Sequence, residues 1–133
     1  MQTKNELLKL LKENNNWEKK YKSLLQLGKL VEPISLEKKN DENLISGCEN
    51  NVWLNITFDN EEVQIHLYSE SRLVNGIIYL LLDFIQNQSL NNLKINDLSN
   101  NLQAYDLPSM LSATKMSGID SIIKSLERKL IVL

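Results

Sequence analysis

Cysteine and histidine are nearly absent from this chain of 133 residues, which contains one of each. One cysteine cannot form an internal disulfide, and this usage is typical of proteins in a reducing cytosol. One Cys and one His also cannot supply the four ligands of a structural zinc site within one chain. The composition therefore excludes a disulfide scaffold and predicts a cytoplasmic protein without a Cys/His metal site.

Long apolar runs and an excess of charge of one sign are missing as well. The longest apolar run, residues 77–82, is six residues long, whereas a membrane-spanning helix needs about 20. The first residues lack the basic-then-apolar pattern of a signal peptide. Because 15 basic residues nearly balance 17 acidic ones, no basic surface is expected for nucleic acid or anionic lipid. We expect neither a nucleic acid nor a membrane as a partner.

Apolar residues at helical spacing predict helices toward both ends of the chain. Thr3–Glu6 has the Ser/Thr-x-x-Glu spacing of a capping box, which predicts a helix start. Apolar stripes predict further helices over residues 17–27, 74–85 and 119–130, with shorter helical turns within 89–111. The 74–85 stripe is the cleanest, so we expect this helix at the centre of the core. Candidate caps are Asn15 or Asn16, Ser69 or Ser71, and Ser112 or Thr114.

Between these helices the apolar residues alternate with a period of two. Residues 52–58 and 63–68 alternate in this way around a turn at 59–62, which predicts an antiparallel hairpin with one buried face. Two strands alone are marginally stable, so helices must cover that face, and a third strand is possible. We predict a single α+β domain over residues 1–133, in which helices from both ends of the chain cover a small antiparallel sheet.

The polar segment before the first predicted strand holds the single cysteine. Cys48 follows Gly47 and precedes Glu49 and Asn50. A glycine at this position permits positive φ and lets the backbone of a partner come close. We interpret Cys48 as the working residue and its neighbours as the loop that carries it. The alternative, an inert buried cysteine, stays open at this point.

Histidine is the first partner to consider for this thiol, since Cys48 and His66 would be the nucleophile and base of a cysteine hydrolase. The predicted hairpin pairs Phe58 with Val63 and so places His66 opposite Asn55. Asn55 lies about 23 Å from Cys48 along an extended chain. A hydrogen-bonded dyad would need the loop to fold back sharply, and we expect His66 to face solvent instead.

Without a base, a thiol with a pKa of about 8.5 is mostly protonated at neutral pH. Such a thiol is too weak to attack amides, yet it exchanges readily with disulfides and persulfides. A sulfur relay or a redox sensor is therefore the chemistry that the residues favour. No P-loop, GxGxxG, GxSxG or paired His/Glu motif is present, and we expect Trp17 and Trp53 to be core aromatics.

Four motifs in order resemble those of one known family. Residues 16–21 with 27–28 are similar to its opening NWEEKY…LG, and residues 45–54 are similar to its I-x-GC-x-S-x-VW signature. Residues 69–76 resemble SDAxIVKG, and residues 112–118 resemble LTPSRSxG. By these motifs, which span nearly the whole chain, the sequence resembles the SufE/CsdE family of sulfur acceptors for cysteine desulfurases.

The resemblance implies a SufE/IscU-like fold and a role in iron-sulfur cluster assembly. In the family, a PLP-dependent desulfurase of the SufS or CsdA type holds sulfur as a cysteine persulfide. The loop cysteine, here Cys48, takes the terminal sulfur, stimulates the desulfurase, and passes the sulfur to an Fe-S scaffold or another acceptor. The cysteine rests in an apolar pocket, and its loop must move. The resemblance further implies no cofactor in this chain, no independent turnover, and a possible homodimer.

The resemblance also marks departures and candidate contacts. Glu70, which replaces a family aspartate, and Lys115, which replaces an arginine, are candidates for the partner interface. Lysine keeps the charge of arginine but loses its planar fork. Ser117 replaces the usual Asn/Gln, and Asn50 replaces a serine but keeps a hydrogen-bonding side chain. An IscU-like scaffold is the remaining alternative, although it needs several thiolate ligands and the chain has one cysteine.

Overall fold

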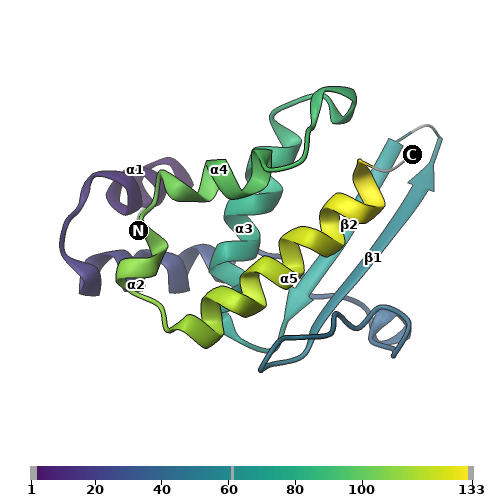
Figure 1. Cartoon of the computed structure of the whole chain (residues 1–133), viewed down its shortest axis with the longest axis horizontal. Helices are drawn as coiled ribbons and strands as arrows, with labels where there is room; N and C mark the ends of the chain where they lie inside the picture. The colour runs from purple at the N-terminus through teal and green to yellow at the C-terminus, as the bar shows by residue number, and fades with distance from the viewer. Residues whose placement is uncertain (1–2, 61, 132–133) are drawn as a thin grey trace.

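The structure is a computed structural model that describes residues 3–60 and 62–131 (Figure 1). Within these residues five α-helices and three short 3-10 helices surround one two-stranded sheet. In chain order the elements are α1 (Lys4–Glu13), α2 (Trp17–Gly28), η1 (Leu36–Lys38), β1 (Val52–Asp59), β2 (Glu62–Ser69), α3 (Arg72–Gln86), η2 (Leu90–Asn92), α4 (Asp97–Gln103), η3 (Leu107–Ser109) and α5 (Ala113–Leu130). The order confirms the predicted α+β fold.

Local cap chemistry sets the starts of the four longer helices. The side chains of Thr3, Asn16, Ser71 and Ser112 each accept a hydrogen bond from a backbone amide in the first turn of the helix that follows. An amide in the first turn has no partner within its helix, so such a cap stabilises the helix start. All four residues were among the predicted caps.

The two strands form the predicted antiparallel hairpin. Phe58 pairs with Val63 and Asn55 pairs with His66, which confirms the predicted register. Part of the predicted turn, Glu61, lies outside the described residues. The possible third strand is reduced, in the part of the chain that the structure describes, to an isolated bridge between Leu44 and β1.

One face of the hairpin is covered by helices, because α3 packs on β2 and α5 packs on β1 (Figure 1). Val52, Leu54 and Leu67 are fully buried on this face. The strands extend beyond the helices at the turn, where the Phe58 side chain is 66% exposed. The predicted buried face is therefore confined to the half of the hairpin that lies near the Cys48 segment.

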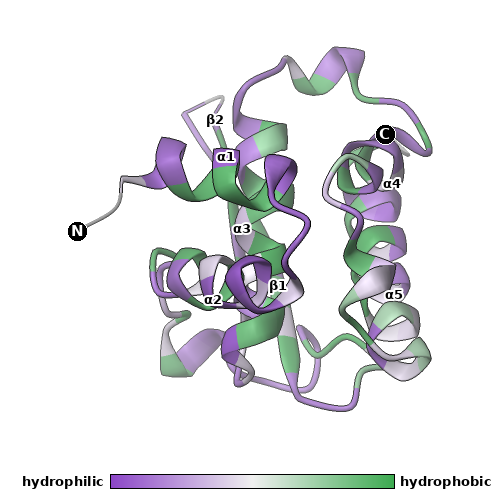
Figure 2. Cartoon of the chain, turned by 90° about the vertical axis from the view of Figure 1, so that its left-hand side faces the viewer, coloured by the Kyte–Doolittle hydropathy of each residue, from purple (hydrophilic) through white to green (hydrophobic). Residues whose placement is uncertain are grey.

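Helix α3 lies at the centre, as predicted, between α1 and α2 on one side and α5 on the other (Figure 2). Its crossing with α2 is a backbone contact made possible by two glycines. A Cβ atom on Gly76 would collide with the carbonyl oxygen of Leu24, and one on Gly28 would collide with that of Arg72. Since only glycine fits at these points, the crossing fixes the start of α3.

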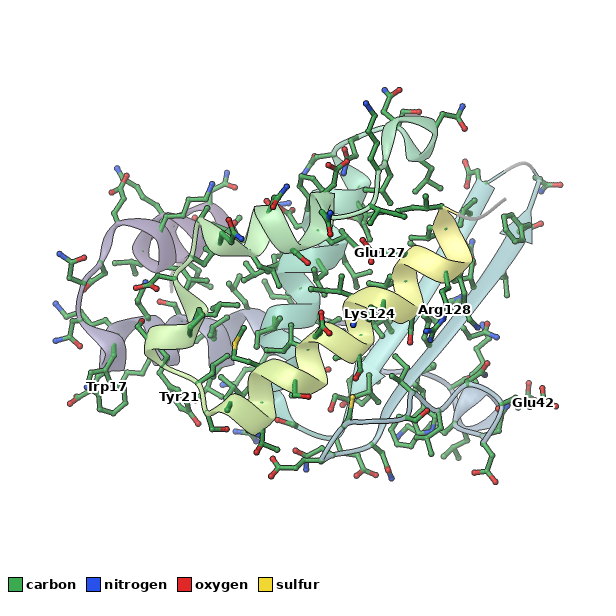
Figure 3. The ribbon with its side chains drawn as sticks, viewed as in Figure 1. Trp17, Tyr21, Glu42, Lys124, Glu127 and Arg128 are labelled. Carbon is green, nitrogen blue, oxygen red and sulfur yellow. The ribbon has the colours of Figure 1, made fainter. Side chains whose placement is uncertain are left out.

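The two tryptophans differ in burial. Trp53 is buried, as predicted, but on the hairpin face opposite the helices. Trp17 points outward from the first turn of α2 and is 59% exposed, so the prediction of a core position was wrong (Figure 3). Among the described residues, no helix combines the length and the apolar character needed to cross a bilayer.

Candidate functional site

Residues 46–50, the Cys48 loop, lie between β1 and the middle of α5. Gly47 has φ of +90°, a conformation that side chains other than glycine rarely adopt,. A Cβ atom at Gly47 would also lie 2.7 Å from Oγ of Ser121 on α5. Glycine is therefore required here both by its backbone and by the close approach to the helix. The predicted positive φ is confirmed, while the close approach of a partner backbone stays a prediction.

The thiol of Cys48 is half-buried against α5. Its Sγ donates a hydrogen bond of 3.5 Å to the carbonyl oxygen of Gly118. A cavity of about 20 Å³ remains beside the thiol, enough for one water-sized atom,. The cavity is lined mainly by apolar side chains from β1, α3 and α5, which include Val52, Val74, Ile119 and Ile122.

Burial raises the pKa of the Cys48 thiol above its ordinary value, because the charged thiolate loses solvation in an apolar site,. The hydrogen bond to Gly118 acts in the same direction, since a carbonyl oxygen accepts from the protonated thiol and repels a thiolate. Both effects favour the protonated form of the resting thiol.

Lys115 holds the outer side of the same loop. Its Nζ lies 3.7 Å from the carboxylate of Glu49 and donates a hydrogen bond of 3.5 Å to Oδ1 of Asn50. Both contacts are long, and the Glu49 side chain is 58% exposed, so we expect them to be weak. Asn50, which replaces the serine of the family, uses its side chain for a hydrogen bond, as its polar character predicted. Lys115, which replaces an arginine, cannot form a two-pronged bond to one carboxylate and instead contacts one side chain of each of two loop residues,.

The carboxyl side of the loop is anchored at Asn51. Its carbonyl oxygen accepts hydrogen bonds from Oγ of Ser69 (3.1 Å) and from the backbone amide of Glu70 (3.2 Å). The buried Asn75 side chain bonds both the amide and the carbonyl of Ser69. Glu70 therefore supports the loop through its backbone, while its exposed side chain is free to contact another molecule.

His66 is not brought to the thiol. It lies opposite Asn55 on β2 and lines a separate cavity with Glu32, Tyr79 and Asp83. Desolvation, together with the charge of nearby Lys38, lowers the pKa of His66. The prediction that His66 faces solvent was wrong in part, because its Nε2 atom is buried without a partner. The geometry offers no Cys-His dyad.

Two residues of α5 form the seat of the thiol: Gly118, which the sequence analysis named only as the end of a motif, and Ser121, which it did not name. Gly118 supplies the carbonyl oxygen, and Ser121 lies against Gly47. Their spacing places two small residues on one face of the helix, which is the signal that could have identified them. In residues 3–60 and 62–131, no cluster of three potential ligands is placed to hold a metal ion.

Comparison with known proteins identifies the family of the chain. The family model described as "SufE: Fe-S metabolism associated domain" matches residues 5–130. The chain is 30% identical to the "Sulfur acceptor protein CsdE" of Escherichia coli (strain K12) over 112 residues, 83% of this chain and 76% of that protein. It is 25% identical to the "Cysteine desulfuration protein SufE" of Wigglesworthia glossinidia brevipalpis over 114 residues, 85% and 79% of the two chains.

A third relative, described as "Uncharacterized SufE-like protein", comes from Haemophilus influenzae (strain ATCC 51907 / DSM 11121 / KW20 / Rd). The identity is 27% over 122 residues, which are 91% of this chain and 97% of that protein. The family model spans the cysteine loop and its seat on α5, and each of the three relatives matches more than four fifths of the chain. The chain belongs to the SufE family.

Proposed function

We propose that this protein accepts sulfur from the persulfide of a cysteine desulfurase onto Cys48. In the transfer, the Cys48 sulfur attacks the terminal sulfur of the partner persulfide, R–S–SH. A new S–S bond forms on Cys48, the S–S bond of the partner breaks, and the partner leaves as R–SH. The proton lost by Cys48 is balanced by the proton gained by the leaving thiolate, so no oxidant or reductant is needed.

The observation that carries this proposal is a lone thiol on a loop that is fixed at its ends and loose between them. Within the described part of the chain, no backbone-to-backbone hydrogen bond involves residues 46–50. Local opening costs least where few contacts hold the backbone. Cys48 lies three residues from each of the anchors Ile45 and Asn51, so an extended loop can place it at most about 10 Å from either anchor.

The resting pocket suits a protein that carries a reactive sulfur. The cavity of about 20 Å³ beside the thiol is of the size needed for one further small atom, such as the outer sulfur of a persulfide,. Its apolar lining would keep other thiols and water from a Cys48 persulfide after the loop closes. The raised pKa of the unloaded thiol keeps it unreactive until a partner draws the loop out.

The partner that fits this chemistry is a PLP-dependent cysteine desulfurase of the Suf or Csd type. PLP would stay with the partner, and this chain would have no cofactor and no turnover of its own. Glu70 and Lys115, at the two sides of the loop, are the proposed contacts for that partner. The sulfur would next pass to an Fe-S scaffold or another acceptor in the cytoplasm. A homodimer stays a prediction that light scattering can test.

The proposal is tested by desulfurase activity with wild type and Cys48→Ser. Wild-type protein should raise sulfide release from L-cysteine by a purified desulfurase, and Cys48→Ser should give no increase. Binding of both proteins to the desulfurase should be similar, since the serine variant keeps the docking surface. Full stimulation by Cys48→Ser would contradict the proposal.

A further inference from the structure

The hairpin face opposite the helices carries a cation held by two aromatic rings. The Nζ atom of Lys39 lies 5.3 Å from the centre of the Trp53 ring and 5.5 Å from that of Tyr68. Trp53 and Tyr68 are direct partners across the two strands, so their side chains project from the same face. Both distances are within the range of a cation–π interaction.

Lys39 belongs to a strap, residues 35–42, which contains η1 and places the Lys39 side chain over this face. Hydrogen bonds within the chain shape it: the Asn40 side chain donates to the carbonyl of Glu37, and the Asn43 side chain donates to that of Lys38. In the part of the chain that the structure describes, Lys39 forms no salt bridge. The Lys39 side chain is therefore anchored by its contacts with the Trp53 and Tyr68 rings.

The strap leads directly into the Cys48 loop through residues 43–45, the leading segment. The Ile45 amide donates to the carbonyl of Val52, and the Leu54 amide donates to the carbonyl of Asn43, each at 2.8 Å. These two bonds flank Trp53 in the sequence. The same short stretch of β1 therefore holds both the cation and the amino side of the loop.

We propose that Lys39 is a positioning residue for Cys48, acting through Trp53 and the leading segment. With Lys39 in place, the loop has two fixed ends, and Cys48 can move only along an arc between them. Without it, the two backbone hydrogen bonds of the leading segment remain but open more often, and the amino side of the loop is held less firmly. The consequence for sulfur transfer rests on the proposed function, whereas the effect on the leading segment does not.

Amide hydrogen exchange tests the structural part of the proposal. Lys39→Met keeps the alkyl chain but loses the charge, and it should speed exchange of the Ile45 and Leu54 amides about fivefold, because two cation–π contacts are lost. Lys39→Arg should exchange as wild type, since a guanidinium also binds aromatic faces. Lys38→Met, a neighbouring charge in the same strap, should likewise exchange as wild type.

Equal exchange in Lys39→Met and wild type would overturn the proposal, and so would an equal increase in Lys38→Met. Amides that pair β1 with β2 serve as internal references for global stability. The desulfurase assay then tests the consequence. Lys39→Met should raise the acceptor concentration that gives half-maximal stimulation several-fold and leave the maximal stimulation unchanged. Lys39→Arg should behave as wild type in the same assay.

The two measurements fail in different ways. If no acceptor variant, including wild type, stimulates the desulfurase, the proposed function fails while the exchange result still decides the role of Lys39. If wild type stimulates but Lys39→Met has the same half-maximal concentration, the positioning of Cys48 by Lys39 is wrong. A decrease in maximal stimulation alone would also contradict a positioning role.

Discussion

Two contacts between segments far apart in the sequence are built from glycine, but they hold their partners very differently. At the crossing of α2 and α3, the backbones touch at Gly28 and Gly76, and no other residue fits. At the seat of the Cys48 loop, a Cβ atom on Gly118 would stay 3.8 Å from the nearest atoms of Cys48. The first contact is tight between two backbones, whereas the second leaves room at Gly118, beside the thiol, and is close only where Gly47 meets the Ser121 side chain.

The difference agrees with what each region has to do in a sulfur carrier. The α2–α3 crossing holds the start of α3, which with Ser69 and Asn75 anchors the fixed end of the loop. The loop itself is held by one thiol hydrogen bond and the two long contacts of Lys115. In the proposed function, a rigid frame around a weakly held loop would let the thiol move while the rest of the fold stays in place.

The largest expected effect is on the free energy of unfolding, when a methyl group is added at a glycine of each region. Gly76→Ala should lower the free energy of unfolding by about 1–3 kcal/mol, because the added methyl collides with the α2 backbone,. Gly118→Ala has room for its methyl and gains helix propensity, so its unfolding free energy should change by less than about 1 kcal/mol. Chemical denaturation measures both. Equal destabilisation by the two variants would remove the contrast between the regions.

Loosening the loop should have a smaller effect, visible in thiol reactivity rather than in stability. Lys115→Met removes the contacts with Glu49 and Asn50 and should speed iodoacetamide alkylation of Cys48 about twofold to fivefold, the range of an exposed ion pair. Lys124→Met is the matched control: Lys124 pairs with Asp120 at 3.0 Å on the same helix but does not contact the loop (Figure 3). The same acceleration in Lys124→Met would rule out a specific role for Lys115.

The smallest expected effect is a pH dependence of stability that originates in the seat of the thiol. Because burial raises the pKa of Cys48 in the folded state, the protonated thiol stabilises the fold below the ordinary thiol pKa of about 8.5. This stabilisation is lost as the pH rises through the raised pKa. Wild type should therefore lose stability relative to Cys48→Ser in alkaline solution, as measured by urea denaturation. A constant difference from neutral to alkaline pH would contradict the buried seat.

Features that depend on neighbouring residues could be predicted from the sequence. The caps Thr3, Asn16, Ser71 and Ser112 bond to amides within three residues, so their chemistry is local. The hairpin register could be predicted because both strands have a two-residue apolar period and are joined by one short turn, which fixes how they pair. The loop cysteine was identifiable because the chain has no other.

Features that depend on distant partners could not be predicted. Lys39 meets Tyr68 only after the hairpin forms and the strap crosses it, and charged residues in a polar segment carry no sign of such a contact. Trp17 has the spacing of a core residue, yet the first turn of α2 has no element covering it. The contact of Cys48 with Gly118 could not be predicted, because it depends on how α5 packs against a loop that lies 70 residues earlier in the chain.

The central claim is that Cys48 alone receives the sulfur. Wild-type protein incubated with a cysteine desulfurase and L-cysteine should gain the mass of one sulfur atom, located to the Cys48 peptide by mass spectrometry, and Cys48→Ser should gain none. Absence of the added mass from wild-type protein, or the same added mass on Cys48→Ser, would contradict the account.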